Sequence, residues 1–126
     1  MAEATAYLLD SHILLWSLYE EAKLSTAQRA ILESDARTFI SAATIWEIEI
    51  KKKAGRLPLP DAIWEQAADV GHDFLSIEPA HARFAGALPA VHGDPFDRML
   101  IAQATLNGLT ILTVDEMIRA YPVATV

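Results

Sequence analysis

The segment Ala6-Tyr7-Leu8-Leu9-Asp10 decides how this chain folds. Its apolar and aromatic residues follow one another without polar alternation, which is typical of a strand buried on both faces in a helix-covered parallel sheet. The segment ends on a carboxylate. Because ligands of open α/β sheets bind beyond the carboxyl ends of the strands, Asp10 is the first candidate for a functional residue.

The length and composition fit a single α/β domain over residues 1–126. A chain of 126 residues buries about two-thirds of its unfolded surface in one core. The longest apolar run, 13–16, is far shorter than the roughly 20 residues that cross a bilayer, and no secretory signal is present. With no cysteine in the chain, we expect no disulfide, no thiolate zinc site, and a cytoplasmic protein without membrane contact.

Strand and helix patterns alternate along the rest of the chain. We expect further strands at 38–40, 74–77 and 109–114, with an added edge strand at 123–126. Helices are predicted at 11–19, 26–34, 42–54, 61–70, 79–87 and 95–107, followed by a short helix that stops at Pro122. This alternation predicts an α/β/α sandwich with a central parallel sheet of four to five strands.

Three aspartates occupy positions that suit a shared site. Asp10 and Asp115 each follow an apolar strand, so both belong at the same edge of a parallel sheet. Asp97 lies in the first turn of its helix, where the helix dipole favours an anion. Each also has a structural explanation, since Asp97 can support the helix cap at Asp94 and Asp115 can cap the last helix.

Glu47 is a fourth candidate, and it comes from the middle of a helix. It shares one helical face with Ala43, Ile50 and Ala54, which places a carboxylate inside a mostly apolar stripe. The alternative is a surface ion pair with Lys51, four residues further on. The apolar stripe favours the interpretation as a site residue.

The convergence of such acids would require a cation. Two carboxylates about 5 Å apart repel by roughly 3 kcal/mol at an effective dielectric near 20, so a cluster of four needs a counter-charge. Oxygen ligands alone select a hard ion, Mg²⁺ or Mn²⁺, over zinc. Such an ion polarises a phosphoryl oxygen and lowers the pKa of an attacking water. The set therefore indicates hydrolysis of a phosphodiester bond.

The basic residues leave two interpretations open. The net charge of −7 argues against a broad basic surface for nucleic acid. Four of the ten basic residues cluster within 51–56, either as a solvated face that complements the end of the Glu47 helix or as an RNA contact. We also expect Glu49 to pair with Lys53, and Arg98 to anchor a neighbouring acid.

Four motifs follow one another along the chain: L-L-D-S-H at 8–12, S-A-A-T-I-W-E-I at 41–48, H-G-D-P-F-D-R-M-L-I-A-Q-A at 92–104 and L-T-V-D at 112–115. In this order they resemble the PIN-domain ribonucleases, and more narrowly the VapC-type toxins of bacterial toxin–antitoxin modules. The resemblance spans nearly the whole chain. Its most specific part is the motif that begins at Asp94.

The resemblance implies a Mg²⁺-dependent or Mn²⁺-dependent endoribonuclease with a PIN-like fold. It implies that the catalytic and metal-binding acids are Asp10, Glu47, Asp97 and Asp115. It also implies three supporting hydroxyl residues, which are Ser11, Ser41 and Thr113. Ser11 stands where threonine is commoner in the family, and Ser41 has a sufficient structural role as a helix cap. An RNA substrate, a small antitoxin and a homodimer are the implied partners.

A non-catalytic module that binds Mg²⁺ or a protein is the alternative function. A receiver-like module or a D-x-D phosphatase needs paired acids after the first strand, where this chain has Ser11 and His12 beside Asp10. No H-E-x-x-H spacing is present, and we expect His92 to be a hydrogen-bonded structural histidine. The tryptophans are expected in the core or at an interface; they are Trp16, Trp46 and Trp64.

Overall fold

A four-stranded parallel sheet forms the centre of the computed structural model, which describes residues 4–126. Its strands, in chain order, are β1 (Tyr7–Leu9), β2 (Thr38–Ser41), β3 (Asp73–Leu75) and β4 (Thr110–Leu112). Their spatial order is β3-β2-β1-β4, and every pairing is parallel. Because β1 has a neighbour on both sides, the strand that ends before Asp10 lies in the middle of the sheet.

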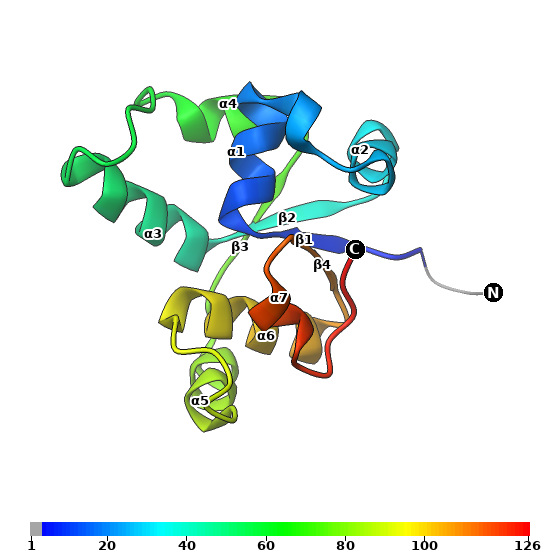
Figure 1. Ribbon diagram of the computed structural model, residues 1–126, viewed down its shortest axis with the longest axis vertical. Helices are drawn as coiled ribbons and strands as arrows, with labels where there is room; N and C mark the ends of the chain where they lie inside the picture. The colour runs from blue at the N-terminus through cyan, green and yellow to red at the C-terminus, as the bar shows by residue number, and fades with distance from the viewer. Residues whose placement is uncertain (1–3) are drawn as a thin grey trace.

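Helices cover both faces of the sheet. They are α1 (Ser11–Tyr19), the 3₁₀ helix η1 (Glu21–Lys23), α2 (Thr26–Glu33), α3 (Ala42–Lys53), α4 (Ile63–Asp69), α5 (Pro79–Ala87), α6 (Pro95–Asn107) and α7 (Glu116–Arg119). Figure 1 shows α1, α2 and α4 on one side of the sheet and α5, α6 and α7 on the other. The predicted α/β/α sandwich is confirmed.

The core has two halves that meet at β1. Leu8 and Leu9 are both fully buried, and adjacent residues of a strand point to opposite faces. Leu8 packs in a cluster with Leu100 of α6, whereas Leu9 packs with Ile13 of α1 in the other cluster. The burial of this segment on both faces, predicted from its sequence, is confirmed.

Capping residues fix the helix ends, and the predicted cap at Asp94 is among them. The Ser25 hydroxyl accepts a hydrogen bond from the Gln28 N–H at 3.0 Å and forms a capping box at the start of α2. Asp94 caps α6, and Gly108 ends it at φ +66°, a conformation that favours glycine. These local signals fix the length of α6, and thereby the position of Asp97 in its first turn.

The chain departs from the predicted elements at the edges of the sheet. The strand β3 is shorter than predicted, and Phe74 in it is half-exposed, because β3 pairs on one side alone. The predicted terminal strand is reduced to one parallel bridge between Ile111 and Thr125. Between residues 4 and 126, the helices are all too short or too polar to cross a bilayer.

Two leucines of α6 test the assignment of the core. Leu100 is 2% exposed and Leu106 is 45% exposed. Removing the buried side chain leaves a cavity, so Leu100→Ala is expected to lower the free energy of unfolding by about 2–5 kcal/mol, and Leu106→Ala by less than about 1 kcal/mol. Urea denaturation followed by circular dichroism measures both values. Equal losses would contradict this core.

Candidate active site

Asp10 and Asp115 meet at the carboxyl edge of the sheet because β1 and β4 are parallel neighbours. One Asp10 oxygen accepts a hydrogen bond from the Ile13 N–H at 3.0 Å, which caps α1, and the other accepts one from the Thr113 hydroxyl. The Thr113 oxygen in turn accepts a hydrogen bond from the Asp115 N–H at 2.9 Å. Thr113 therefore links the two acids directly.

The buried position of Asp10 changes its acidity. Burial raises the pKa of this carboxyl group, and the Asp115 carboxylate acts in the same direction. The hydrogen bonds from Thr113 and Ile13 oppose the rise, because both favour the ionised form. An ionised Asp10 is therefore held in one orientation at some cost in free energy.

Asp115 uses its two oxygens for different purposes. Oδ1 accepts hydrogen bonds from the N–H groups of Met117, at 2.8 Å, and Ile118, at 3.4 Å, and so caps α7. Oδ2 lies 3.3 Å from His92 Nε2. The two interpretations of Asp115, as a helix cap and as a site residue, are thus compatible with one side-chain position.

His92 joins Asp115 to Asp97. Its Nε2 lies 2.8 Å from Asp97 Oδ2, and its Nδ1 accepts a hydrogen bond from the Asp94 N–H at 3.3 Å. Because Nδ1 is an acceptor, the ring hydrogen is on Nε2, which donates to both acids. Within the described part of the chain, these three side chains are the one group of metal-ligand types whose donor atoms lie within 4.8 Å of one another.

The orientation of His92 suits a positioning residue better than a metal ligand. A ligating histidine donates its other ring N–H to an acceptor, whereas the second ring nitrogen of His92 faces a backbone donor. His92 is hydrogen-bonded as predicted, but its contact with Asp97 was not predicted. The sequence signal for this contact is the position of His92 two residues before Asp94, within the motif at 92–104.

Asp97 has the most strongly perturbed acidity of the site. Burial, reinforced by the Asp94 carboxylate, raises the pKa of Asp97 to about 7, although His92 opposes the rise. The carboxylates of Glu47 and Asp115 raise it further. The contact between Trp46 and Phe96, which directly precede Glu47 and Asp97 in the sequence, places α3 against α6 at this point. Asp97 does not complete a capping box with Asp94, because the Asp94 N–H is bonded to His92 instead.

Glu47 reaches the site from α3. It is 8% exposed, and Lys51 Nζ lies 3.2 Å from its Oε2. The predicted ion pair therefore exists, but at the edge of the acidic cluster and with a buried carboxylate. The predicted apolar stripe is wrong at its far end, because Ile50 and Ala54 are exposed. The buried residues of α3 are Ala43, Thr44, Glu47 and Ile48.

The two predicted supporting serines differ from Thr113. Ser41 is fully buried, and its hydroxyl accepts a hydrogen bond from the Ala43 N–H at 3.0 Å, which caps α3. This cap is the structural role that the sequence suggested. Ser11 is the first residue of α1, and its hydroxyl makes no hydrogen bond with any residue from 4 to 126.

Arg98 does not anchor an acid, so that prediction is wrong. Its guanidinium group donates hydrogen bonds to four backbone carbonyls, those of Ala85, Leu88, Pro89 and His92, at 2.8–3.3 Å. The Tyr121 hydroxyl donates to the Pro89 carbonyl at 2.6 Å and accepts from the His92 N–H at 2.8 Å. Arg98 and Tyr121 therefore fix the loop that carries His92.

The basic segment 51–56 divides into paired and unpaired residues. Lys52 lies 3.7 Å from Glu49 and 3.2 Å from Asp61, so the predicted pairing of Glu49 with Lys53 is wrong. Glu49 also accepts a hydrogen bond from the indole N–H of Trp64 at 2.9 Å. Lys53 and Arg56 are exposed and form no ion pair within residues 4–126.

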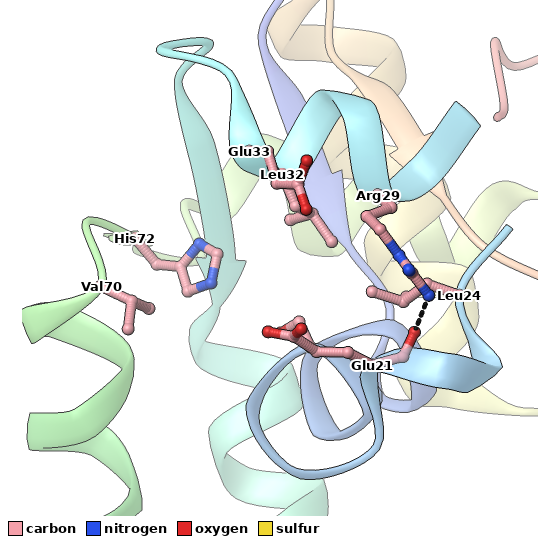
Figure 2. Close-up of a pocket in the computed structure, with 8 residues that line it drawn as sticks. Glu21, Leu24, Arg29, Leu32, Glu33, Val70 and His72 are labelled. Carbon is pink, nitrogen blue, oxygen red and sulfur yellow. Dashed lines mark hydrogen bonds between the residues drawn. The ribbon is translucent and has the colours of Figure 1, made fainter. Parts of the chain in front are cut away.

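A separate cavity of about 140 Å³ lies near the opposite edge of the sheet. Figure 2 shows its lining, in which His72 faces Glu21 and Glu33. The His72 Nδ1 lies 2.7 Å from the Thr38 hydroxyl, and burial lowers the pKa of this imidazole. Thr38 begins β2 and His72 precedes β3, so the cavity lies toward the amino ends of the strands, away from the acids.

This sheet and its acidic edge are those of a PIN domain: the sequence pattern of that family matches residues 7–124, and the chain belongs to it. Within the family it is similar to Ribonuclease VapC22 of Mycobacterium tuberculosis. The two are 30% identical over 120 residues, which cover 93% of this chain and 92% of that protein.

Solved structures share the fold at lower identity. A toxin–antitoxin complex from Klebsiella pneumoniae superposes with a TM-score of 0.68 at 20% identity, covering 96% of each chain. DNA-bound VapBC from Salmonella typhimurium gives 0.69 at 17% identity, covering 97% of each chain. At these identities the likeness establishes the fold.

The raised pKa of Asp97 predicts a pH-dependent stability of the metal-free protein. The folded value of about 7 exceeds the ordinary value of 3.8, so the stability that this group contributes is complete below about pH 4 and lost as the pH rises through about 7. In EDTA, Asp97→Asn is therefore expected to raise Tm by roughly 3–8 °C above pH 7, with a gain that vanishes toward pH 4.

Differential scanning fluorimetry across this pH range measures the effect. Asp61→Asn is the control, because the Asp61 carboxylate is exposed. A gain for Asp97→Asn that is the same at both ends of the range would point to a change in packing rather than in ionisation.

Proposed function

We propose that this chain is a single PIN-like nuclease domain over residues 1–126 that hydrolyses RNA phosphodiester bonds with a divalent metal ion. The proposal is supported by four acids from four separate segments: His92 joins two of them, Thr113 links a third, and the fourth acts on the pKa of Asp97. These acids are Asp10, Glu47, Asp97 and Asp115. The 30% identity to a protein named as a ribonuclease supports the choice of RNA.

The donor set fits a hard divalent ion. Asp97, Asp115, Asp10 and Glu47 would hold Mg²⁺ or Mn²⁺, because all four supply carboxylate oxygens. Lys51 offsets one negative charge. Burial is the main cause of the raised pKa of Asp10 and of Asp97, and neighbouring carboxylates add to both rises, so a bound cation would relieve part of the cost. When bound, the ion stabilises charge on the phosphoryl group and lowers the pKa of the attacking water.

The remaining residues of the site orient these acids. Thr113 and the Ile13 N–H hold the two oxygens of Asp10 in a fixed direction. His92 donates a hydrogen bond to Asp97 and to Asp115 and so holds their carboxylates close together. A preorganised set of this kind needs little rearrangement to bind an ion.

We further propose that the nuclease acts as the toxin of a type II toxin–antitoxin system. The relative carries a VapC name, and the solved structures with the same fold include toxin–antitoxin complexes. A small antitoxin protein is the proposed partner, and a homodimer in the cytoplasm is the proposed working form. Such a partner would keep the acidic site inactive until it is removed.

RNA cleavage by purified protein tests the proposed reaction. Wild-type protein with Mn²⁺ or Mg²⁺ is expected to cut RNA, to stop in EDTA, and to resume when the ion is restored. Asp97→Asn is expected to lower the rate by at least about 100-fold, because it removes a carboxylate ligand while leaving an acceptor for His92. Undiminished cleavage by this variant, or metal binding without any cleavage by the wild type, would reject an active site at these acids.

The positioning role of His92 is tested by metal binding. His92→Ala is expected to weaken Mn²⁺ binding by about 10- to 100-fold, because Asp97 and Asp115 lose their shared donor. His92→Gln keeps an N–H group and should recover part of the affinity. Isothermal titration calorimetry measures both. Tighter binding by His92→Ala would show instead that the imidazole competes with the ion for the same oxygens.

A further inference from the structure

An aromatic pair, in which Trp46 is exposed and Phe96 is partly buried, lies beside the acidic site. Trp46 of α3 and Phe96 of α6 lie with ring centroids 5.3 Å apart at an interplanar angle of 76°, an edge-to-face contact. Each residue directly precedes a candidate acid, Trp46 before Glu47 and Phe96 before Asp97. Both rings therefore lie next to the acids, and the two rings pack edge to face.

Trp46 differs from the other tryptophans in its exposure. Trp16 and Trp64 pack against the core, whereas Trp46 is 63% exposed, so of the two predicted positions the core is excluded for Trp46. An isolated exposed apolar residue needs no explanation, but an exposed indole that packs against a second ring beside a group of acids is suited to stack on a flat ligand.

The exposed face of α3 continues from Trp46 to an unpaired cation. Ile50 and Lys53 follow at spacings of four and seven residues, which places all three on one side of the helix. Ile50 is 45% exposed, and Lys53 makes no ion pair within the described residues. Lys53 lies about 10 Å along the helix axis from Trp46, a distance within reach of a neighbouring phosphate of an extended strand.

Because the protein is acidic, contacts that do not depend on charge must supply much of any affinity for RNA. A net charge of −7 and a cluster of acids at the site give little general attraction for a polyanion. Stacking of a base on an aromatic ring does not depend on charge and strengthens binding by about 5- to 150-fold per base. It also requires a base that is free of pairing.

We infer that Trp46, which packs against Phe96, stacks on an unpaired nucleobase next to the phosphate that is cut. Lys53 contacts the sugar-phosphate backbone of the same strand. The inference rests on the proposed function and gives Trp46 a role in holding the RNA strand at the site of cleavage. Trp46 is thus a residue that selects the state of the RNA, and it takes no part in the reaction at the phosphate.

Binding of labelled RNA tests this surface. In the slowly cutting Asp97→Asn background and without added metal, Trp46→Ala is expected to weaken binding of a single-stranded oligonucleotide by about 5- to 150-fold and to leave binding of the matching duplex unchanged. Trp46→Phe should retain most of the affinity, because a ring remains. Leu106→Ala, at the opposite end of α6 from Phe96, is the exposed apolar control and should bind as its parent does. Fluorescence anisotropy measures each affinity.

The contribution of Lys53 is tested by salt dependence. Lys53→Gln is expected to weaken binding of the single strand and to reduce the slope of log K against log salt by about 0.7, the value of one phosphate contact. Lys52→Gln is the control, because Lys52 is already paired with Asp61 and Glu49. An unchanged slope for Lys53→Gln would remove this residue from the surface.

Cleavage kinetics separate the inference from the proposed function. In the otherwise wild-type enzyme, Trp46→Ala is expected to raise KM for single-stranded RNA with kcat within about threefold of the parent. If the parent cuts RNA and Trp46→Ala matches it in affinity and KM, the inference alone is overturned. If the parent cuts no RNA with either ion, the proposed function fails, and the binding experiment still decides the role of Trp46.

A protein occupant gives a different result. If Trp46→Ala leaves RNA binding unchanged but alters the mass measured by light scattering, the face contacts a second copy of the chain and the inference is overturned. Thermal melting of each variant confirms that the exposed substitutions leave the fold intact.

Discussion

The parallel pairing of β1 with β4 is the constraint on which the site depends. It sets Leu9 opposite Leu112, so the acids that follow these strands emerge side by side. Thr113 then links them, since it donates to Asp10 and accepts from the backbone of Asp115. A shift of one residue in this register would turn the inward side chains outward and separate the acids. The chemistry of this edge is thus fixed by the backbone ladder between β1 and β4.

Grouping these acids works against folding, and the rest of the molecule supplies the stability. Burial and mutual repulsion raise the pKa of Asp10 and of Asp97. Ionisation of both acids therefore lowers the free energy of unfolding. Two apolar clusters, one on each face of the sheet, oppose that cost. Lys51 and His92 lower it locally by supplying one positive charge and one shared hydrogen-bond donor. The site therefore lies at an edge of the core, where Asp10 and Glu47 are buried and Asp97 and Asp115 are only partly removed from water.

Local sequence signals predicted much of the fold, and long-range contacts explain what they missed. The apolar run before Asp10 and the cap at Asp94 act within a few residues, so they could be interpreted from the chain alone. The carbonyl partners of Arg98 depend on where α5 and its loop pack, which no spacing reveals. Ile50 lies on the same helical face as Glu47, but periodicity does not tell where the neighbouring element ends, and so it did not predict that Ile50 is exposed.

The loop before α6 is held through its main chain. Arg98 and Tyr121 contact carbonyl and amide groups of residues 85–92, and neither contact depends on the side chains at Ala90 or Val91, which point into solvent. Because these hydrogen bonds involve only backbone groups of the loop, almost any side chain is tolerated at those two positions. The outer surface of this loop can therefore be remodelled, for instance to suit a different target, without moving the imidazole that the same loop delivers to the acids.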